Sequence, residues 1–410
     1  MEYPKLRPVE AFPYNEPGKE GICLRDPSNI TDTILVVPHH LFEIIRLFDG
    51  RHSLLDVQTV YAKRHGNIPL KEQIEGVINT LDKAMLLESE RFTQFLKDLK
   101  EEFRRSSIRK AAFAGKGYDS DPGKLRQQID TFFTSDGGPC KPGGKRSGKK
   151  SKNVVKGAVL PHIDFDRGGP CFAWGYKEIE KSSNARCFIL LGTSHGDMNG
   201  LFSVTKKDFE TPFGLLRTDK EIVTAIEKAG GKGFFKGEFA HKNEHSLEFQ
   251  AIFLHYLYDG KRDVSIVPVL CSSFHEMIKD GKSPSSVQEV NDFIETLKGV
   301  IKGNGKDVFL IASADLSHVG PRFGDPLPLT SQDLQKIAEE DMDMIRFIEN
   351  VDAEGFFHSI QKDGDRRKIC GLSPIYVLLK VLDASRGKLL KYEQWPDPRG
   401  MVSFASIGLY

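Results

Sequence analysis

From residue 153 onward, short apolar runs of strand length alternate with longer runs whose apolar residues recur at helical spacing. The strand-like runs are VVKGAVL, ARCFILLG, VSIVPVL and DVFLIAS, and the helical runs are KEIVTAIEKAG, HSLEFQAIFLHYLYDG and SVQEVNDFIETLKGVI. Strands that are apolar at nearly every position are typical of a sheet covered by helices on both faces. The pattern therefore predicts an α/β fold with a central mixed sheet, to which the final ASIGLY run adds an edge strand.

The first hundred residues show a different order of elements. The run TDTILVVPHHLFEIIRLFDGRHSLLDV predicts a strand, a helix that stops at Asp49–Gly50, and a second helix capped by Ser53. A further amphipathic helix is expected near Leu70–Ala84, and MLLESERF is expected to close the unit as a wing. The residues that share one face of that helix are Ile74, Val77, Ile78 and Leu81. This order predicts a small α+β, winged-helix-like domain over residues 1–100.

The charge of this amino-terminal domain argues against nucleic acid as its partner. Residues 1–100 contain 13 Lys and Arg against 15 Asp and Glu, a balance of −2 (13 − 15). A module that reads DNA normally carries a basic face. The balance favours a packing or peptide-docking role.

A second domain is expected over residues 101–410, and a basic segment interrupts it. Residues 100–133 have a charged, helical composition, and residues 134–152 are rich in Gly, Ser and Lys. Seven basic residues and no acidic residue occur from Lys141 to Lys156. A segment of this composition cannot build a core, so a flexible, solvated loop is favoured over a site for an anionic partner.

Composition narrows the class of protein further. The formal net charge is +1, and no apolar run approaches the roughly 20 residues that cross a bilayer. The start MEYPKLRPVE lacks the pattern of a secretory signal. Six cysteines are scattered without CxxC spacing, which argues against a zinc ribbon and a disulfide framework. We therefore expect a cytoplasmic protein with no membrane partner.

Histidines follow three of the predicted strands. His162 comes after VVKGAVL, His195 after ARCFILLG, and the stretch from Asp315 to His318 after DVFLIAS. Ligands and catalytic groups of α/β sheets gather beyond the carboxyl ends of the strands. A single histidine there is more often structural, but three at equivalent positions favour a shared site. Neutral imidazole is a common ligand of Zn, Cu and Fe.

Two candidates arise for the remaining ligands. Cys370 precedes a helix that Ser373 is expected to cap, and a cysteine near a helix amino end has a lowered thiol pKa. His245 and Glu248 share a helix face behind a predicted Asn243 cap. They ligate the metal, orient its ligands, or serve only as a capping and surface pair. The residues alone leave this choice open.

Seven motifs then resemble those of the Memo family, whose bacterial and archaeal branch is called AmmeMemoRadiSam system protein B. They occur in the family's order between about Ser107 and Tyr410. The motifs are PHIDFDRGG, LGTSHG, DFETPFGLLRTD, NEHSLEFQ, IVPVL, SADLSHVGPRFGD and ICGLSPIYVLL. The chain departs from the family at Ala114–Tyr118, where a Trp is missing, and at Phe165–Arg167, where a Tyr-rich segment is usual. The amino-terminal unit is similar to small PqqD-like peptide-docking domains.

The resemblance implies a fold like that of class III extradiol dioxygenases and a particular ligand set. His162, His195 and Cys370 match the metal-binding positions of the family, and Asp315 and His318 lie beside the metal. Within such a site His318 is expected to act as general base, with Asp315 orienting its ring.

The expected function is that of a metal-binding protein, with three alternatives. A mononuclear Fe(II) or Cu ion would make it a dioxygenase-like redox enzyme, acting on an unknown small molecule or peptide. Zn would suit a hydrolase, because two histidines, a cysteine and water form a known catalytic zinc site. A non-catalytic protein that binds metal or a partner is the third alternative. The family's association implies radical S-adenosylmethionine (SAM) proteins and AMMECR1-like proteins as partners.

Overall fold

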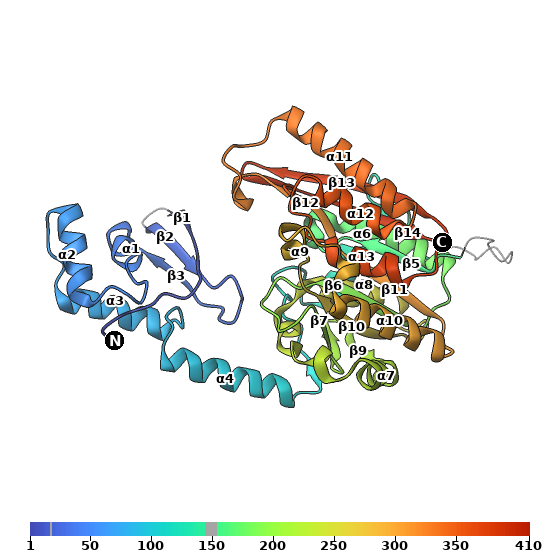
Figure 1. The fold of residues 1–410 in the computed structure, drawn as a ribbon, viewed down its shortest axis with the longest axis horizontal. Coiled ribbons are helices and arrows are strands. Elements are labelled where there is room, and N and C mark those ends of the chain that lie inside the picture. Colours follow the sequence, from blue (N-terminus) through green and yellow to red (C-terminus); the bar gives the residue numbers. More distant parts are fainter. Residues whose placement is uncertain (17–18, 144–153) are drawn as a thin grey trace. The chain divides into compact units, whose positions relative to one another are not determined.

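The computed structural model describes residues 1–16, 19–143 and 154–410. These residues form two compact units, Met1–Arg105 and Ser106–Tyr410 (Figure 1). The part of the predicted basic loop from residue 144 to 152 lies outside the described residues. Within the described ranges, no helix combines the length and the apolar character that crossing a bilayer requires.

The first unit consists of an antiparallel sheet followed by helices. Its sheet has the strand order β1-β2-β3, and its core lies between this sheet and the first three helices. The elements are β1 (Glu10–Glu16), β2 (Lys19–Arg25), β3 (Ile34–Val37), α1 (His39–Ile45), α2 (Leu54–His65), α3 (Lys71–Lys83) and α4 (Glu90–Arg105). Ser53 caps α2 in a capping box with Asp56, as predicted. The predicted apolar face of α3 is buried, which confirms the helical periodicity.

The sequence interpretation of this unit is incomplete at one end and wrong at the other. The hairpin of β1 and β2 was not predicted, because β1 has only exposed and half-buried positions and so lacks a clear apolar alternation. The predicted wing at MLLESERF is wrong. Leu87 forms an isolated bridge to Leu6, and Glu90 already begins α4.

The second unit is built on an 11-stranded mixed sheet. Its strand order is β12-β14-β5-β11-β6-β10-β9-β8-β4, with β13 beside β14 and β7 beside β10. The central pairs β5–β11, β11–β6 and β6–β10 are parallel, and β14 is antiparallel to β5. The strands are β4 (Ile108–Arg109), β5 (Gly157–Leu160), β6 (Cys187–Thr193), β7 (Phe202–Val204), β8 (Asp208–Thr211), β9 (Gly214–Thr218), β10 (Ser265–Cys271), β11 (Val308–Ser313), β12 (Asp315–Val319), β13 (Gly387–Asp397) and β14 (Gly400–Leu409).

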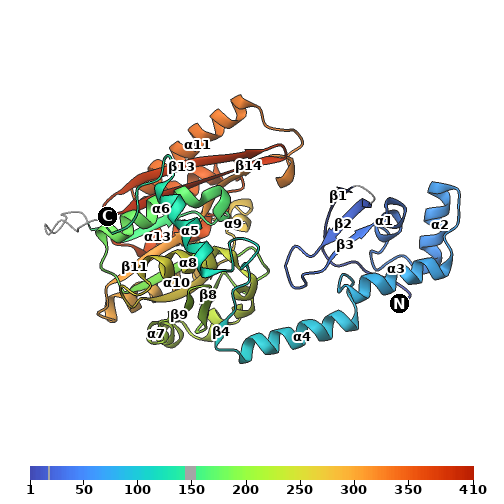
Figure 2. The ribbon, with the colours of Figure 1, turned by 180° about the vertical axis from the view of Figure 1, so that it is seen from behind.

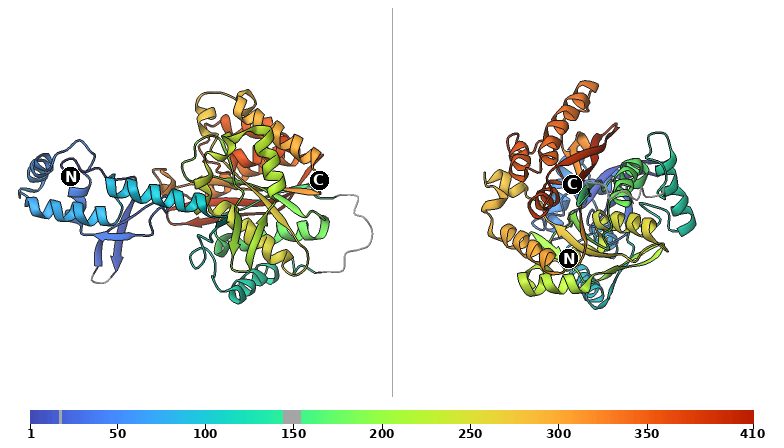
Figure 3. Two further views of the ribbon diagram at one scale, coloured as in Figure 1. Left: turned by 90° about the horizontal axis from the view of Figure 1, so that it is seen from below. Right: turned by 90° about the vertical axis from the view of Figure 1, so that its right-hand side faces the viewer.

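Helices cover both faces of this sheet, which confirms the predicted fold class. Helices α7, α10, α11, α12 and α13 contribute to the core on one face, and α5, α6 and α8 contribute to the core on the other. Views from opposite sides and along two further directions show these layers (Figure 2, Figure 3). The helices are α5 (Pro122–Thr134), α6 (Phe165–Ser182), α7 (Lys220–Gly230), α8 (His245–Tyr258), α9 (His275–Lys279), α10 (Gln288–Gly303), α11 (Ser331–Glu349), α12 (Ala353–Gln361) and α13 (Leu372–Val381).

The last strand differs from its prediction. The ASIGLY run forms the end of β14, which lies inside the sheet with all ten residues buried. An edge position is therefore wrong, because β5, β12 and β13 all pair with β14.

Candidate metal centre

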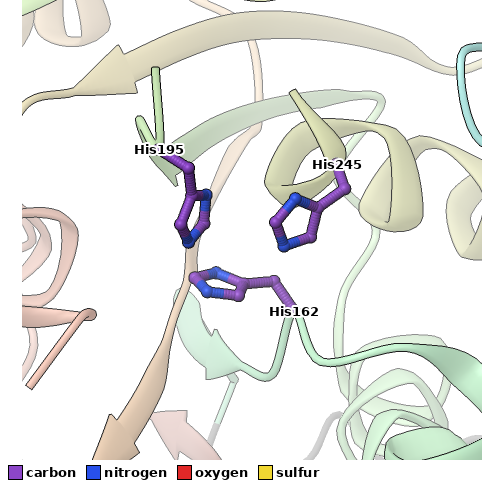
Figure 4. A group of neighbouring side chains, drawn as sticks. All are labelled: His162, His195 and His245. Atoms are coloured by element: carbon purple, nitrogen blue, oxygen red, sulfur yellow. The ribbon is translucent and has the colours of Figure 1, made fainter. Parts of the chain in front are cut away.

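Side chains from distant parts of the second unit converge at the carboxyl ends of its central strands. His162 follows β5, His195 follows β6, and His245 is the first residue of α8. Ring nitrogens of these three histidines all lie within 4.8 Å of one another, and their rings face a common point (Figure 4). Cys370 joins them from the segment before α13. The described residues thus bring together four side chains of types that can bind a metal ion.

His162 is buried and held in one orientation. Its Nδ1 lies 2.9 Å from the main-chain oxygen of Ser313. A carbonyl oxygen only accepts, so Nδ1 carries the hydrogen and the lone pair of a neutral ring lies on Nε2. Nε2 lies 3.0 Å from the Sγ atom of Cys370. The ring therefore presents its free nitrogen to the cluster.

Glu244 holds His195 in the same way. The buried Glu244 carboxylate accepts a hydrogen bond of 2.8 Å from the main-chain N–H of His195, and its Oε1 lies 3.0 Å from Nδ1 of the His195 ring. A carboxylate on Nδ1 fixes the tautomer that offers Nε2 and makes the ring a stronger ligand. Glu244 is a functional residue that the sequence interpretation missed.

His245 also faces Glu244, with its Nδ1 3.3 Å from Oε1 of the same carboxylate. Its ring stacks on that of His195, with 4.5 Å between the centroids. The helix that carries it is capped by Glu244, which accepts from the main-chain N–H of Ser246. The predicted Asn243 cap is therefore wrong, and one carboxylate both starts α8 and orients two histidines.

Cys370 lies directly before Gly371, the N-cap residue of α13. The predicted Ser373 cap is wrong, because the helix begins at Leu372 and the Ser373 hydroxyl makes no capping bond. The N–H of Gly371 donates to the carbonyl of Asp315 at 2.9 Å. A Cβ atom at this glycine would lie 2.5 Å from the Cβ of Ala314, so only glycine fits this close approach. The contact places the thiol beside the histidines.

The charges of this cluster are strongly coupled. Burial opposes ionisation of Cys370, but the His162 and His195 imidazoles hold the pKa of its thiol well below the usual range. Burial likewise opposes charge on His162, yet Cys370 and Asp315 raise its pKa to about 9. His245 behaves differently, because burial and the neighbouring His195 hold its pKa well below that of a free imidazole. The metal-free site thus favours a thiolate next to an imidazolium, with His245 neutral.

Asp315 and His318 lie on β12 at the edge of the cluster. The Asp315 carboxylate accepts from the main-chain N–H groups of His162 and Ile163, and its Oδ2 lies 3.7 Å from Nε2 of His162. His318 is positioned by its own strand, since its Nδ1 lies 3.1 Å from the Leu316 carbonyl oxygen. The Asp315 carboxylate thus anchors the segment of His162, and Leu316 holds the ring of His318.

Glu248 lies away from the histidine cluster, although it shares a helix with His245. Both of its oxygens are engaged by Arg109, by the hydroxyl of Tyr118 and by the main-chain N–H groups of Ala112 and Phe113. Arg109 and Glu248 are both fully buried. Glu248 therefore ties the segment after β4 to α8, and Glu244 takes the orienting role.

The donors present suit a transition-metal ion. Imidazole nitrogen and thiolate sulfur are ligands of Zn, Cu and Fe, whereas Mg and Ca prefer oxygen. Each of the three imidazoles has its Nδ1 directed at an acceptor, on Ser313 for His162 and on Glu244 for the other two. The arrangement can hold one ion with His162 and His195, completed by Cys370, His245 or both.

Sequence comparison identifies the family of this chain. Residues 109–407 match the family described as Memo-like protein. A MEMO1 family protein of Aquifex aeolicus is 30% identical over 99% of this chain and its own full length. Two archaeal proteins align over nearly their whole lengths. The MEMO1 family protein of Caldivirga maquilingensis is 28% identical over 74% of this chain and 99% of its own. The MEMO1 family protein of Methanopyrus kandleri is 27% identical over 73% of this chain and 98% of its own length. The α/β unit with its strand-end histidines is thus of the Memo-like class, and the chain belongs to the Memo family.

Proposed function

We propose that this protein binds one transition-metal ion through His162, His195 and Cys370, with His245 as a further donor. The observation that carries the proposal is the convergence of two Nδ1-anchored histidines and a cysteine whose sulfur lies 3.0 Å from Nε2 of His162. A metal ion would replace the proton that this close pair shares in the metal-free protein. Fe(II) or Cu is the preferred ion, and Zn is the alternative.

Iron or copper at this position would supply redox chemistry, and zinc would supply Lewis acidity. The chain's own contribution is proton handling by His318. Because Nδ1 of His318 donates to the Leu316 carbonyl, its Nε2 carries the lone pair and can accept a proton from a bound substrate. His318 would serve as general base in either reaction class, and the resemblance to class III extradiol dioxygenases leads us to favour a dioxygenase-like oxidoreductase over a zinc hydrolase.

Metal analysis tests the proposal. Anaerobically purified protein is expected to contain close to one equivalent of iron or copper, or to take up one equivalent on titration. Cys370→Ala is expected to lose most of that capacity, and Asn350→Ala on the surface is expected to keep it. Absence of metal from the purified protein together with no uptake on titration would overturn the proposal.

Oxygen consumption separates the two reaction classes. With iron or copper bound, a dioxygenase-like enzyme consumes oxygen when given its substrate, whereas a zinc protein that cleaves esters or amides does not. In either class His318→Gln is expected to lower turnover while metal content stays the same. Loss of metal from this variant would show that His318 is a ligand rather than a base.

We further propose that the first unit docks an extended peptide segment of a radical SAM or AMMECR1-like partner. A groove of about 560 Å³ runs between β3 and α3, with Leu35 and Val37 on one side and Gly76 and Thr80 on the other. In the described sheet β3 is an edge strand, so its outer main-chain groups are available to pair with an added strand. Such a groove offers both hydrogen bonds and apolar contacts to a peptide.

A variant that fills the groove tests this docking. A Cβ atom added at Gly76 would meet no atom within 4 Å, and Gly76 lines the groove, so Gly76→Arg is expected to leave the helix intact while obstructing the groove. Binding of the purified partner is expected to fall strongly, whereas the exposed Glu72→Arg on the same helix serves as the control. Equal binding by Gly76→Arg and the unaltered protein would contradict the proposal.

A further inference from the structure

A second cleft lies in the Memo-like unit, at the opposite ends of the strands from the histidines. It has a volume of about 1070 Å³. Its wall includes Cys187 and Ser265, the first residues of β6 and β10, and Asp307, which precedes β11. The candidate metal centre lies beyond the carboxyl ends of the same sheet, so the two sites are separate.

Arg262 is the unusual residue of this cleft. Its guanidinium carbon lies 4.1 Å from the centre of the Tyr258 ring, within the range of a cation–π contact. Its Nε and Nη2 atoms are buried and have no hydrogen-bond partner among the described residues. These two atoms form one edge of the guanidinium, with parallel N–H bonds that match the two oxygens of a carboxylate or phosphate. Buried donors without an acceptor are costly, so this edge is poised to gain one.

Some of the other positively charged side chains of the cleft already form ion pairs with carboxylates, and others do not. Arg217 pairs with Asp208 at 2.7 Å, and Lys306 pairs with Asp219 at 2.9 Å. Arg186 lines the cleft, is exposed, and has no ion-pair partner in the described part of the chain.

Carboxylates also line the cleft, but they do not neutralise the positive charge of Arg262 and Arg186. Asp219 and Asp259 are engaged by Lys306 and Arg126. Asp263 and Asp307 are exposed, so water and salt screen their charges. Three cations of the cleft lack a carboxylate partner in the described part of the chain: Arg262, Arg186 and the exposed Lys261, whose ammonium group donates to the Leu257 carbonyl oxygen at 3.1 Å.

We propose that this cleft binds the oxyanion group of a small molecule, a phosphate or a carboxylate, on the Nε–Nη2 edge of Arg262. The Arg262 side chain is only half-buried, so a rotation about its last bonds brings that edge to the ligand. Arg186 adds a second positive charge at the cleft. The cleft is then a ligand site of its own, distinct from the metal centre.

Titration of the full-length protein with inorganic phosphate and, separately, with citrate tests the proposal. The signal followed is the Nε–H resonance of Arg262 in the ¹⁵N NMR spectrum, which is identified by its loss in Arg262→Lys. A saturable shift is expected with at least one of the two anions, and the anion that binds identifies the preferred oxyanion. Arg262→Gln is expected to weaken binding, measured by calorimetry, about tenfold or more, because both parallel N–H bonds are lost.

Arg217→Gln is the matched control, since this arginine lines the same cleft but is 69% exposed and already paired with Asp208. Its affinity is expected to stay within about twofold of the unaltered protein. Absence of a saturable shift with both anions overturns the proposal, as does equal binding by Arg262→Gln. The titration of the unaltered protein decides the matter if Arg262→Gln does not fold. His162→Ala is expected to bind the anion normally, so failure of anion binding is distinguishable from failure of the metal proposal.

Discussion

Glu244 accepts hydrogen from the main chain of His195, and its Oε1 faces the Nδ1 atoms of both His195 and His245. It is 3% exposed, so solvent contributes little to its charge stabilisation. Burial raises its pKa, but the two histidines outweigh this and hold the pKa well below the usual range. At the scale of single residues, the candidate metal centre therefore depends on a carboxylate that is not itself a ligand.

Replacing this carboxylate is expected to weaken metal binding without removing a ligand. Glu244→Gln keeps the shape of the side chain and loses its charge. We expect the affinity for zinc to fall about 10- to 100-fold, the usual effect of removing such an orienting group. Competition with a chromophoric chelator measures the affinity, and Glu227→Gln on the surface of α7 is the control. Unchanged affinity in Glu244→Gln would show that the histidines do not need this carboxylate.

Metal binding is also expected to depend on pH. The pKa of His162 is raised to about 9 by Cys370 and Asp315 against the effect of burial, so at neutral pH its ring must lose a proton before it binds metal. Cys370 is already ionised at that pH, because its pKa is lowered. Zinc affinity should therefore rise from pH 6 to pH 8, by about tenfold per unit for each proton released. Chelator competition at several pH values measures this, and a flat profile would contradict a protonated His162 in the metal-free protein.

The sequence predicted the histidines but not Glu244, for a physical reason. Histidines that follow apolar strands stand out, because strand ends meet at one edge of a sheet. A glutamate at the start of a helix is ordinary, since it also complements the helix dipole. Only the packing of α8 against β6 turns Glu244 toward His195. Glu248, four residues later, is directed instead to Arg109.

At the scale of elements, the start of α13 is fixed against the strands of the sheet. Cys370 and Gly371 pass so close to the turn between β11 and β12 that a side chain at Gly371 would overlap Ala314 and the Asp315 carbonyl. The backbone contact from Gly371 to Asp315 thus sets the position of the thiol.

Gly371→Ala is expected to disturb both stability and the site. Overpacking at a buried contact costs about 1–3 kcal/mol, so the free energy of unfolding should fall by roughly that amount and zinc affinity should fall with it. Urea denaturation measures the first effect. Gly299→Ala in α10, where an added Cβ meets no atom within 4 Å, should instead stabilise the protein by about 0.5–1 kcal/mol. An unchanged free energy of unfolding and an unchanged zinc affinity in Gly371→Ala would mean that this segment moves freely.

Helices and strands were predicted correctly where one face of the element is buried or where all of its residues are buried. β6 is buried at every position and α3 has a single apolar face, so their periodicities are clear. β1 and β13 have mostly exposed or half-buried positions and were not predicted. β14 was placed at an edge because its partners β5 and β12 come from distant parts of the chain, and its sequence neighbour β13 was not predicted.

At the scale of the whole molecule, the boundary at Arg105–Ser106 separates two units with their own cores. The family match begins at residue 109, inside the second unit, and the archaeal relatives cover about three quarters of this chain. All four side chains of the candidate metal centre lie in the second unit.

Residues 106–410 alone are therefore expected to fold and to bind zinc as tightly as the full chain. Chemical denaturation should show a single cooperative transition for this fragment, and chelator competition should give an affinity within about twofold of the full-length value. An aggregated fragment, or one without affinity for zinc, would contradict the independence of the two units.

The central claim is that His162, His195 and Cys370 bind one metal ion. X-ray absorption at the zinc K-edge tests it most directly, on protein loaded with one equivalent of zinc and freed of excess metal. We predict one sulfur neighbour at about 2.3 Å, together with imidazole nitrogens at about 2.0–2.1 Å. A first shell of nitrogen and oxygen alone would contradict Cys370 as a ligand, and loss of the zinc with the excess would contradict the metal site itself.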